Sequence, residues 1–241
     1  SSKVFEESIY EDLEWLQIKY STEIRHQSEH MEDYKGAIKE LQKLDMVYPC
    51  FCSRSEIKAE IMRAGNAPHE EESSIYPGTC RRLSKEERFE KISKEISYAW
   101  RLNIRAASKK LGNLSWNDLR LGNHVLPVGT MGDVVLARKD VPTSYHLSAT
   151  LDDHIQRIGL VTRGEDLVSA THIHRIIQSL LGLKSPRYLH HPLILDSKGV
   201  RLSKRTRAQT VKSLKASGLK RSDVIDLFGK DNILTLLRLI K

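Results

Sequence analysis

The 241-residue sequence predicts an α/β fold built on a parallel sheet. Short runs rich in aliphatic and β-branched residues predict strands over 102–104, 133–137, 158–162 and 188–195. Apolar residues at helical spacing predict a helix over 167–181, between the last two of these strands. Because a helix that joins two strands is typical of parallel pairing, the order of the elements favours a parallel sheet.

Further helices are predicted on both sides of this region. Apolar residues recur at helical spacing over 3–18 and 27–46. Ser53-x-x-Glu56 and Ser84-x-x-Glu87 have the spacing of a capping box, so each predicts the start of a helix. The tail is expected to be helical, with one helix stopping at Gly218 and another capped by Ser222.

Composition and charge narrow the class of protein. Apolar residues make up 39% and charged residues 29%, and no apolar run approaches the roughly 18 residues of a membrane helix. We therefore expect a cytoplasmic protein that does not span a membrane. Residues 201–241 hold 11 Lys and Arg against 3 Asp, so the tail alone accounts for the net charge of +8. Such a tail favours a polyanionic partner such as RNA, although a solvated surface helix has the same composition.

Three cysteines, an odd number, argue against a disulfide framework. Cys50 and Cys52 are separated by one residue, and Cys80 lies on a later loop. Thiolates in this arrangement can bind Zn²⁺, which takes four ligands in a tetrahedron. The fourth ligand must then come from another residue type, for which His69 is one candidate. Three free cysteines without metal are the alternative.

A basic segment follows the last predicted strand and the turn at Gly199. It reads Arg201-Leu202-Ser203-Lys204-Arg205. A small-residue turn followed by Ser-Lys predicts a loop that can bring an ammonium group to a triphosphate, where negative charge accumulates in the transition state. By itself a Ser-Lys pair in a basic segment is more often surface decoration.

Its surroundings make this motif specific. Residues 190–205 resemble the KMSKS region of the glutamyl branch of class I aminoacyl-tRNA synthetases. Residues 142–154 and 161–167 resemble that branch's substrate-pocket segments, in the same order and at similar distances. The resemblance runs from about residue 5 to about residue 218. It implies a Rossmann-type class I synthetase catalytic domain with an inserted α/β subdomain that carries zinc, and a short helical tail.

The resemblance also implies domain boundaries. Residues 1–48 would be the remainder of the first catalytic half, and 49–132 an inserted acceptor-like subdomain with the zinc site. Residues 133–205 would be the second catalytic half with the KMSKS-like loop, and 206–241 the basic helical tail. The family's HIGH-like motif, its acidic motif and its N-terminal arginine are absent, so part of the expected nucleotide site is missing from the sequence.

Site residues follow from the same resemblance. Lys204 and Ser203 would be catalytic, and the segment Arg201, Leu202, Ser203, Lys204 and Arg205 would bind ATP. Arg163 would clamp the glutamate carboxylate with its guanidinium fork, and Tyr145 would hydrogen-bond the amino acid. The alternative is an Arg163 paired with Glu165 or Asp166 and a Tyr145 ring in the core. The metal ligands would be Cys50, Cys52, Tyr76 and Cys80, holding structural zinc.

Two families share these motifs, glutamyl-tRNA synthetase and glutamyl-Q tRNA(Asp) synthetase. Three features favour the second family. They are the cysteine and tyrosine pattern, the amino-acid sequence of residues 166–175 and the 36 residues after Arg205. The expected enzyme is an ATP-dependent ligase that activates L-glutamate with ATP and Mg²⁺ and transfers it to the queuosine base of tRNA(Asp). We expect a monomer. The alternatives are a catalytic fragment of glutamyl-tRNA synthetase, charging the 3′ end of tRNA(Glu), and a non-catalytic RNA-binding relative.

Overall fold

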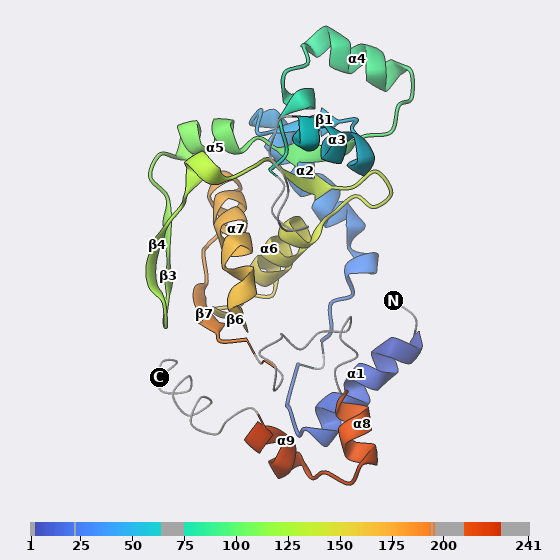
Figure 1. Cartoon of the computed structure of the whole chain (residues 1–241), viewed down its shortest axis with the longest axis vertical. Coiled ribbons are helices and arrows are strands. Elements are labelled where there is room, and N and C mark those ends of the chain that lie inside the picture. Colours follow the sequence, from blue (N-terminus) through green and yellow to red (C-terminus); the bar gives the residue numbers. More distant parts are fainter. Residues whose placement is uncertain (1–2, 22, 64–74, 194, 196–209, 228–241) are drawn as a thin grey trace. The chain divides into compact units, whose positions relative to one another are not determined.

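The computed structural model describes residues 3–21, 23–63, 75–193, 195 and 210–227 (Figure 1). The chain divides into two compact units. One comprises Ser1–Arg25, Thr162–Asp166 and His190–Lys241, and the other His26–Val161 and Leu167–Leu189. Within the described residues, no helix combines the length and apolar character needed to cross a bilayer.

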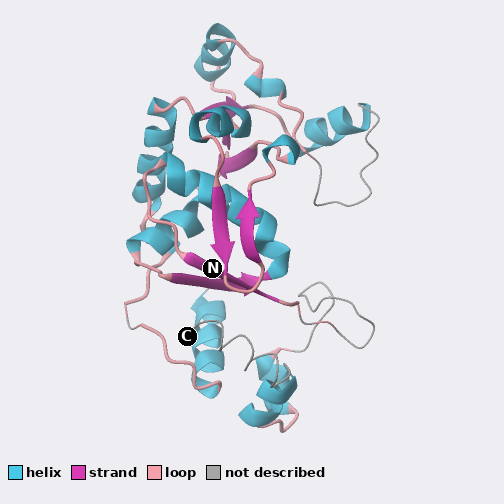
Figure 2. Cartoon of the chain, turned by 90° about the vertical axis from the view of Figure 1, so that its left-hand side faces the viewer, coloured by secondary structure: helices cyan, strands magenta, loops and turns pink. Residues whose placement is uncertain are grey.

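Helices and strands are both distributed along the chain, with helices shown in cyan and strands in magenta in Figure 2. The α-helices are α1 Lys3–Trp15, α2 Met31–Lys43, α3 Arg54–Arg63, α4 Lys85–Ser93, α5 Ile104–Leu111, α6 Tyr145–Ile155, α7 Val168–Leu180, α8 Val211–Ala216 and α9 Arg221–Leu227. The strands are β1 Val47–Cys50, β2 Ala99–Leu102, β3 Ser115–Asp118, β4 Gly122–Val125, β5 Val134–Ala137, β6 Leu160–Gly164 and β7 Arg187–His191. Short 3-10 helices are η1 Gln27–Glu29, η2 Thr79–Arg81, η3 Val128–Thr130 and η4 Glu165–Leu167.

The strands form two sheets. The first has the order β1-β2-β5, with both pairs antiparallel. The second has the order β4-β3-β7-β6, in which β3 pairs antiparallel with β4 and parallel with β7. The α/β prediction is therefore confirmed, and the helix α7 does join two strands of one sheet. The prediction of a parallel sheet alone is wrong, since β4 pairs antiparallel with β3 and the first sheet is antiparallel. The sequence analysis missed β1, β3 and β4.

One predicted strand has different limits because a side chain caps the next helix. The sequence predicted a strand over 102–104, but β2 ends at Leu102 and α5 begins at Ile104. Asn103 between them accepts a hydrogen bond from the backbone N–H of Ala106 at 3.0 Å. An asparagine at this position supplies an acceptor to a first-turn N–H group, so the chain turns into a helix there.

Both predicted capping boxes at the helix starts are confirmed. At α3, Ser53 N–H donates to Glu56 Oε2 at 2.6 Å while Glu56 N–H donates to Ser53 Oγ at 3.2 Å. Ser84 and Glu87 exchange the same pair of bonds at the start of α4. The predicted cap of the last helix is wrong: α9 begins at Arg221, before Ser222, and Asp223 accepts from the Lys220 N–H at 2.8 Å.

Four helices end in the same way. The helices α1, α2, α4 and α6 are each followed by a non-glycine residue with positive φ, namely Gln17 (54°), Asp45 (58°), Glu95 (55°) and Arg157 (55°). The next residue in each case donates its N–H to a carbonyl five residues earlier; the pairs are Ile18 to Leu13, Met46 to Leu41, Ile96 to Lys91 and Ile158 to Asp153. These bonds define Schellman motifs, in which glycine is the usual left-handed residue. Here glycine takes that place only after α7 and α8, among the described helix ends, at Gly182 and Gly218.

The main core belongs to the larger unit. It is built from α2, α5, α6 and α7 against the strands, and its fully buried side chains include Tyr34, Leu41, Leu102, Ile104, Leu136, Leu147, Ile176 and Ile177. The buried carboxylate of Asp152 on α6 accepts hydrogen bonds from Tyr34 and Gln27, each at 2.9 Å. This polar contact ties the α2 segment to α6.

Candidate functional site

A second, smaller core lies where β1 meets the loop around η2. Its buried members are Tyr48, Cys50, Tyr76 and Cys80, and Cys52 packs against them. The three Sγ atoms lie within 4.8 Å of one another. Tyr76 Oη is 3.4 Å from Cys50 Sγ and 3.6 Å from Cys52 Sγ, and Cys52 Sγ is 3.4 Å from Cys80 Sγ. The structure thus brings together all four side chains that the sequence analysis grouped.

These spacings suit a tetrahedral metal site. Bonds of about 2.3 Å from zinc to sulfur place two sulfurs of a tetrahedron about 3.8 Å apart. The separation of 3.4 Å between Cys52 Sγ and Cys80 Sγ is close to that edge, and Tyr76 Oη lies 3.4 and 3.6 Å from two of the sulfurs. His69, the alternative fourth ligand, lies outside the described residues. The donor set therefore fits zinc, with three soft sulfurs and one phenol oxygen.

The pKa values of the side chains in this cluster are shifted in opposite directions. Hydrogen bonding to Cys50 lowers the pKa of Cys80 to about 4. The same hydrogen bond and burial raise the pKa of Cys50, and burial raises the pKa of Tyr76. Two backbone N–H groups also donate to atoms of the cluster. The Phe51 N–H donates to Cys80 Sγ at 3.4 Å, and the Cys80 N–H donates to Tyr76 Oη at 2.9 Å.

Arg101 on β2 places a positive charge beside the same cluster. Its Nε donates to Cys50 Sγ at 3.1 Å, and its guanidinium lies over the Tyr76 ring, 4.0 Å from the centroid. A cation here offsets the negative charge that three thiolates bring to a metal. The sequence analysis did not single out Arg101, because its partners are about 25 and 51 residues away in the chain.

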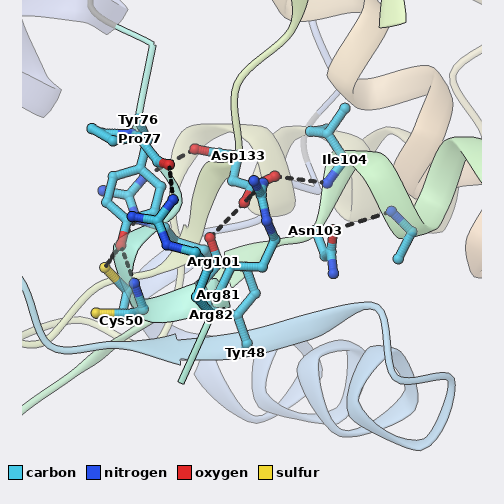
Figure 3. Close-up of polar contacts among 12 residues, drawn as sticks. Tyr48, Cys50, Tyr76, Pro77, Arg81, Arg82, Arg101, Asn103, Ile104 and Asp133 are labelled. Carbon is cyan, nitrogen blue, oxygen red and sulfur yellow. Dashed lines mark hydrogen bonds and ion pairs between the residues drawn. The ribbon is translucent and has the colours of Figure 1, made fainter. Parts of the chain in front are cut away.

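Asp133 connects the η2 loop of the cysteine cluster to β1 and to the start of α5 (Figure 3). Its carboxylate is 1% exposed and accepts from Tyr48 Oη at 2.5 Å, Arg81 Nη1 at 2.6 Å and the Ile104 N–H at 3.0 Å. Burial, together with the bond to Asp133, raises the pKa of Tyr48, so that phenol remains a donor. Three elements thus converge on one carboxylate: β1, η2 and the start of α5.

Tyr145, the predicted glutamate-binding tyrosine, is the first residue of α6 and is 50% exposed. Its ring lies 5.3 Å from the imidazole of His174, a buried residue of α7. His146 lies beside both rings, 5.7 Å from Tyr145 and 5.5 Å from His174. The exposure contradicts the alternative of a core ring and leaves the phenol accessible to a ligand.

Arg163, the predicted carboxylate clamp, is 8% exposed near the end of β6. Its Nε donates to Nε2 of His190 on β7 at 3.2 Å, and His190 is completely buried. Accepting this bond requires the unprotonated nitrogen of a neutral imidazole. A Cβ at the next residue, Gly164, would lie 2.5 Å from Asp166 Oδ1 and 3.0 Å from Leu193. The glycine therefore allows Asp166 and Leu193 to approach the backbone beside the arginine.

The two predicted pocket residues belong to different units, Tyr145 to the larger and Arg163 to the smaller, so each is placed within its own unit. The predicted ATP-binding segment, Arg201, Leu202, Ser203, Lys204 and Arg205, lies outside the described residues. His190 is a residue that the sequence analysis did not single out. Neighbouring residues of a strand face opposite sides, so only one of His190 and His191 can face inward, and His190 is the buried one.

Residues 1–230 of the chain match a family model described as tRNA synthetases class I (E and Q), catalytic domain. The chain belongs to this family. It is accordingly a synthetase catalytic domain, of the ATP-dependent ligase class. The α/β catalytic fold expected from the sequence is confirmed by this match and by the solved structures below.

Two curated relatives illustrate the two branches. The glutamyl-Q tRNA(Asp) synthetase of Rhodobacter capsulatus is 37% identical over 234 residues, which are 93% of this chain and 82% of that protein. The glutamate–tRNA ligase of a Hydrogenobaculum species is 35% identical over 218 residues, 90% of this chain but 45% of the relative. The synthetase chain thus spans less than half of that ligase.

A solved structure gives the same picture of the fold. The crystal structure of a glutamate tRNA ligase from Elizabethkingia meningosepticum, in complex with its amino acid, superposes with a TM-score of 0.68. The superposition covers 83% of this synthetase chain and 42% of the other, at 26% identity.

Proposed function

We propose that the synthetase activates L-glutamate with ATP and transfers it to the queuosine base of tRNA(Asp). The observation that carries this proposal is the likeness to the Rhodobacter capsulatus glutamyl-Q tRNA(Asp) synthetase, which extends over 82% of that protein. Further glutamyl-Q tRNA(Asp) synthetases, from Leptothrix cholodnii and Symbiobacterium thermophilum, are 36% and 34% identical to the chain. The cysteine and tyrosine cluster on β1 and η2 adds support, because the sequence motif favoured this branch.

The reaction has two steps. A carboxylate oxygen of glutamate attacks the α-phosphorus of ATP, forming glutamyl-adenylate and releasing pyrophosphate. A hydroxyl of queuosine then attacks the activated carbonyl carbon, and AMP leaves. The first step needs no general base, since the carboxylate is already ionised at neutral pH.

Three side chains are assigned to these steps. Arg163 would bind the side-chain carboxylate of glutamate through its guanidinium, and the bond from its Nε to His190 would set the plane of that fork. Tyr145, half exposed at the start of α6, would hydrogen-bond the amino acid. Lys204 would stabilise the charge that develops on the triphosphate, with Mg²⁺ escorting ATP.

Zinc would be structural and held by Cys50, Cys52, Tyr76 and Cys80. The side-chain separations of 3.4 to 3.6 Å and the guanidinium of Arg101 beside Cys50 support this assignment. Bound there, the ion would fasten the η2 loop to β1. Arg101 would stabilise the thiolate form of Cys50 when the ligands lose their protons on binding.

We expect purified protein to contain about one Zn²⁺ per chain, since a closed four-ligand site of this kind binds zinc tightly. Elemental analysis of protein never exposed to chelator measures the content. Cys52→Ser should lower it severalfold, whereas Ser53→Ala, at the adjacent residue outside the donor set, should leave it unchanged. A metal content near zero in the wild-type protein would mean that the cysteines are free thiols.

The acceptor is tested by following radiolabelled glutamate onto purified tRNAs. The full-length protein should form glutamyl-adenylate without tRNA and should label tRNA(Asp) that bears queuosine. It should leave tRNA(Glu) and queuosine-free tRNA(Asp) unlabelled. A tRNA that lacks its terminal adenosine is the control, because it lacks both ribose hydroxyls that could accept glutamate at that end while queuosine is intact. Label on tRNA(Glu) that requires the terminal adenosine would assign the chain to the glutamate–tRNA ligases instead.

A further inference from the structure

A cleft on the larger unit lies between α2, the end of α4 and the strands β2 and β5. Its volume is about 460 Å³, and it includes the side chains of Ile38, Ile92, Ile96, Tyr98 and Trp100. None of these residues belongs to the cysteine cluster or to the predicted glutamate pocket. The volume falls within the range of about 300–1,000 Å³ typical of small-molecule sites.

The rim of this cleft is basic. Lys35, Lys39, Arg138 and Lys139 line it, against one acidic residue, Glu95. Lys35 is paired with Glu32 at 2.6 Å and Arg138 with Asp140 at 2.7 Å. Among the described residues, no carboxylate forms an ion pair with Lys39 or Lys139. These two ammonium groups therefore add positive charge to the rim without a direct ion-pair partner, and Glu32 and Glu56 act on them only at longer range.

Aromatic rings form a row beside these cations. The rings of Phe51 and Tyr98 meet edge to face at 5.6 Å, and those of Tyr98 and Trp100 at 5.3 Å. Tyr98 and Trp100 are half-buried and line the cleft, so part of each ring remains accessible. Lys139 Nζ donates to the carbonyl of Phe51 at 2.9 Å, which keeps one cation next to the row.

Aromatic rings bordered by lysines are the surface that binds single-stranded nucleic acid, because bases stack on the rings and phosphates meet the cations. We propose that this cleft binds an unpaired nucleotide of the RNA substrate. A double-stranded segment does not suit it, since paired bases have no free face to stack. The inference rests on the proposed function in one respect, namely that the substrate is an RNA.

The position of the cleft in the chain relates it to the predicted glutamate pocket. Pro142, one of the cleft residues, precedes Tyr145 by three residues. Three residues of extended chain span at most about 11 Å. A nucleotide held in the cleft would therefore keep its neighbours in the strand within a few nucleotide lengths of Tyr145. The acceptor base must come this close, because it has to reach the activated glutamate.

The test compares binding of queuosine-bearing tRNA(Asp) to full-length wild-type protein and to two double variants. Lys39→Ala/Lys139→Ala removes the two unpaired cations of the cleft. Lys109→Ala/Lys110→Ala removes two exposed lysines of α5, at the same cost in net charge. We expect the cleft variant to bind about tenfold more weakly and to lower the slope of log affinity against log salt by about 1.4, the value for two phosphate contacts on a single strand. The α5 variant should bind as the wild type does.

A second measurement needs no variant. Ultraviolet crosslinking of the bound tRNA, followed by mass spectrometry, should attach nucleotides to the peptide with Tyr98 or Trp100. An RNA duplex without unpaired bases should give no such crosslink. If the cleft binds a nucleotide within a strand, excess AMP should compete only weakly with the bound tRNA. Strong competition by AMP would assign the cleft to a free nucleotide instead. Crosslinks confined to other peptides, with affinity and salt slope equal in the two double variants, would overturn the proposal.

The outcomes separate this proposal from the function itself. Glutamate-dependent exchange of pyrophosphate into ATP and labelling of tRNA report the proposed function of the wild-type protein. If both were absent while tRNA still crosslinked to Tyr98 or Trp100, the function would fail and the cleft would stand. If both were present without a crosslink in the cleft and without loss of affinity in the cleft variant, the cleft alone would fail.

Discussion

Replacing Arg163 with alanine is expected to raise the glutamate concentration needed for half-maximal ATP–pyrophosphate exchange by more than about tenfold. Removing one partner of a buried, hydrogen-bonded charge pair costs about 2–5 kcal/mol. Arg163 is 8% exposed, so little water could replace it beside a bound carboxylate. The ATP requirement should change far less, since the guanidinium is assigned to glutamate alone.

Two further variants sharpen this test. Arg163→Lys keeps the charge but loses the planar fork, and it should recover only part of the lost affinity. Arg187→Ala, on the exposed start of β7, is the matched control for removing an arginine from the same sheet. Equal increases in the glutamate and ATP requirements would show that Arg163 maintains the fold of the site and does not select the substrate.

Replacing Asp133 with alanine should lower the free energy of unfolding by about 3–5 kcal/mol, as expected when one partner of a buried ion pair is removed. The substitution leaves Tyr48 Oη, the Arg81 guanidinium and the Ile104 N–H without their common acceptor. Urea unfolding followed by tryptophan fluorescence measures the loss. Because the η2 loop is held through Arg81, zinc should also be released at a lower urea concentration than in the wild type.

The control for Asp133 is an aspartate seven residues further along the chain. Asp140 pairs with Arg138 at 2.7 Å, but its side chain is 63% exposed. Exposed ion pairs are screened by water, so Asp140→Ala should change stability far less. If the two variants lost equal stability, burial of Asp133 would not be what makes its hydrogen bonds important.

The sequence predicted the helix starts that carry a capping box better than it predicted the helix ends, whereas α2 begins at Met31, four residues after its predicted start. Capping boxes at Ser53 and Ser84 are local patterns, and both are present. The helices predicted over 3–18 and 27–46 end at Trp15 and Lys43 instead. Each overshoots by three residues because no glycine marks the stop, and the apolar residues Ile18 and Met46 continue the spacing through a Schellman turn.

The candidate site shows the same division between local and distant information. The ligand set Cys50, Cys52, Tyr76 and Cys80 was grouped from residue type and family resemblance, and the fold brings these side chains together. Arg101, Asp133 and His190 gain their roles from partners 25 to 85 residues away, as in the contact of Arg101 with Tyr76 and the bond from Tyr48 to Asp133. A single sequence carries no spacing rule for such pairs.

The non-glycine residues with positive φ at four helix ends bear on how the stability of this protein could evolve. A residue with a Cβ in that conformation costs about 1–2 kcal/mol relative to a right-handed one, and glycine avoids most of this cost. Gln17, Asp45, Glu95 and Arg157 all carry side chains there. Against a net stability of about 5–15 kcal/mol for a typical domain, four such positions are a substantial fraction. The protein could therefore gain heat resistance by single glycine substitutions at Gln17, Asp45 or Arg157, without altering any residue assigned here to glutamate, zinc or RNA.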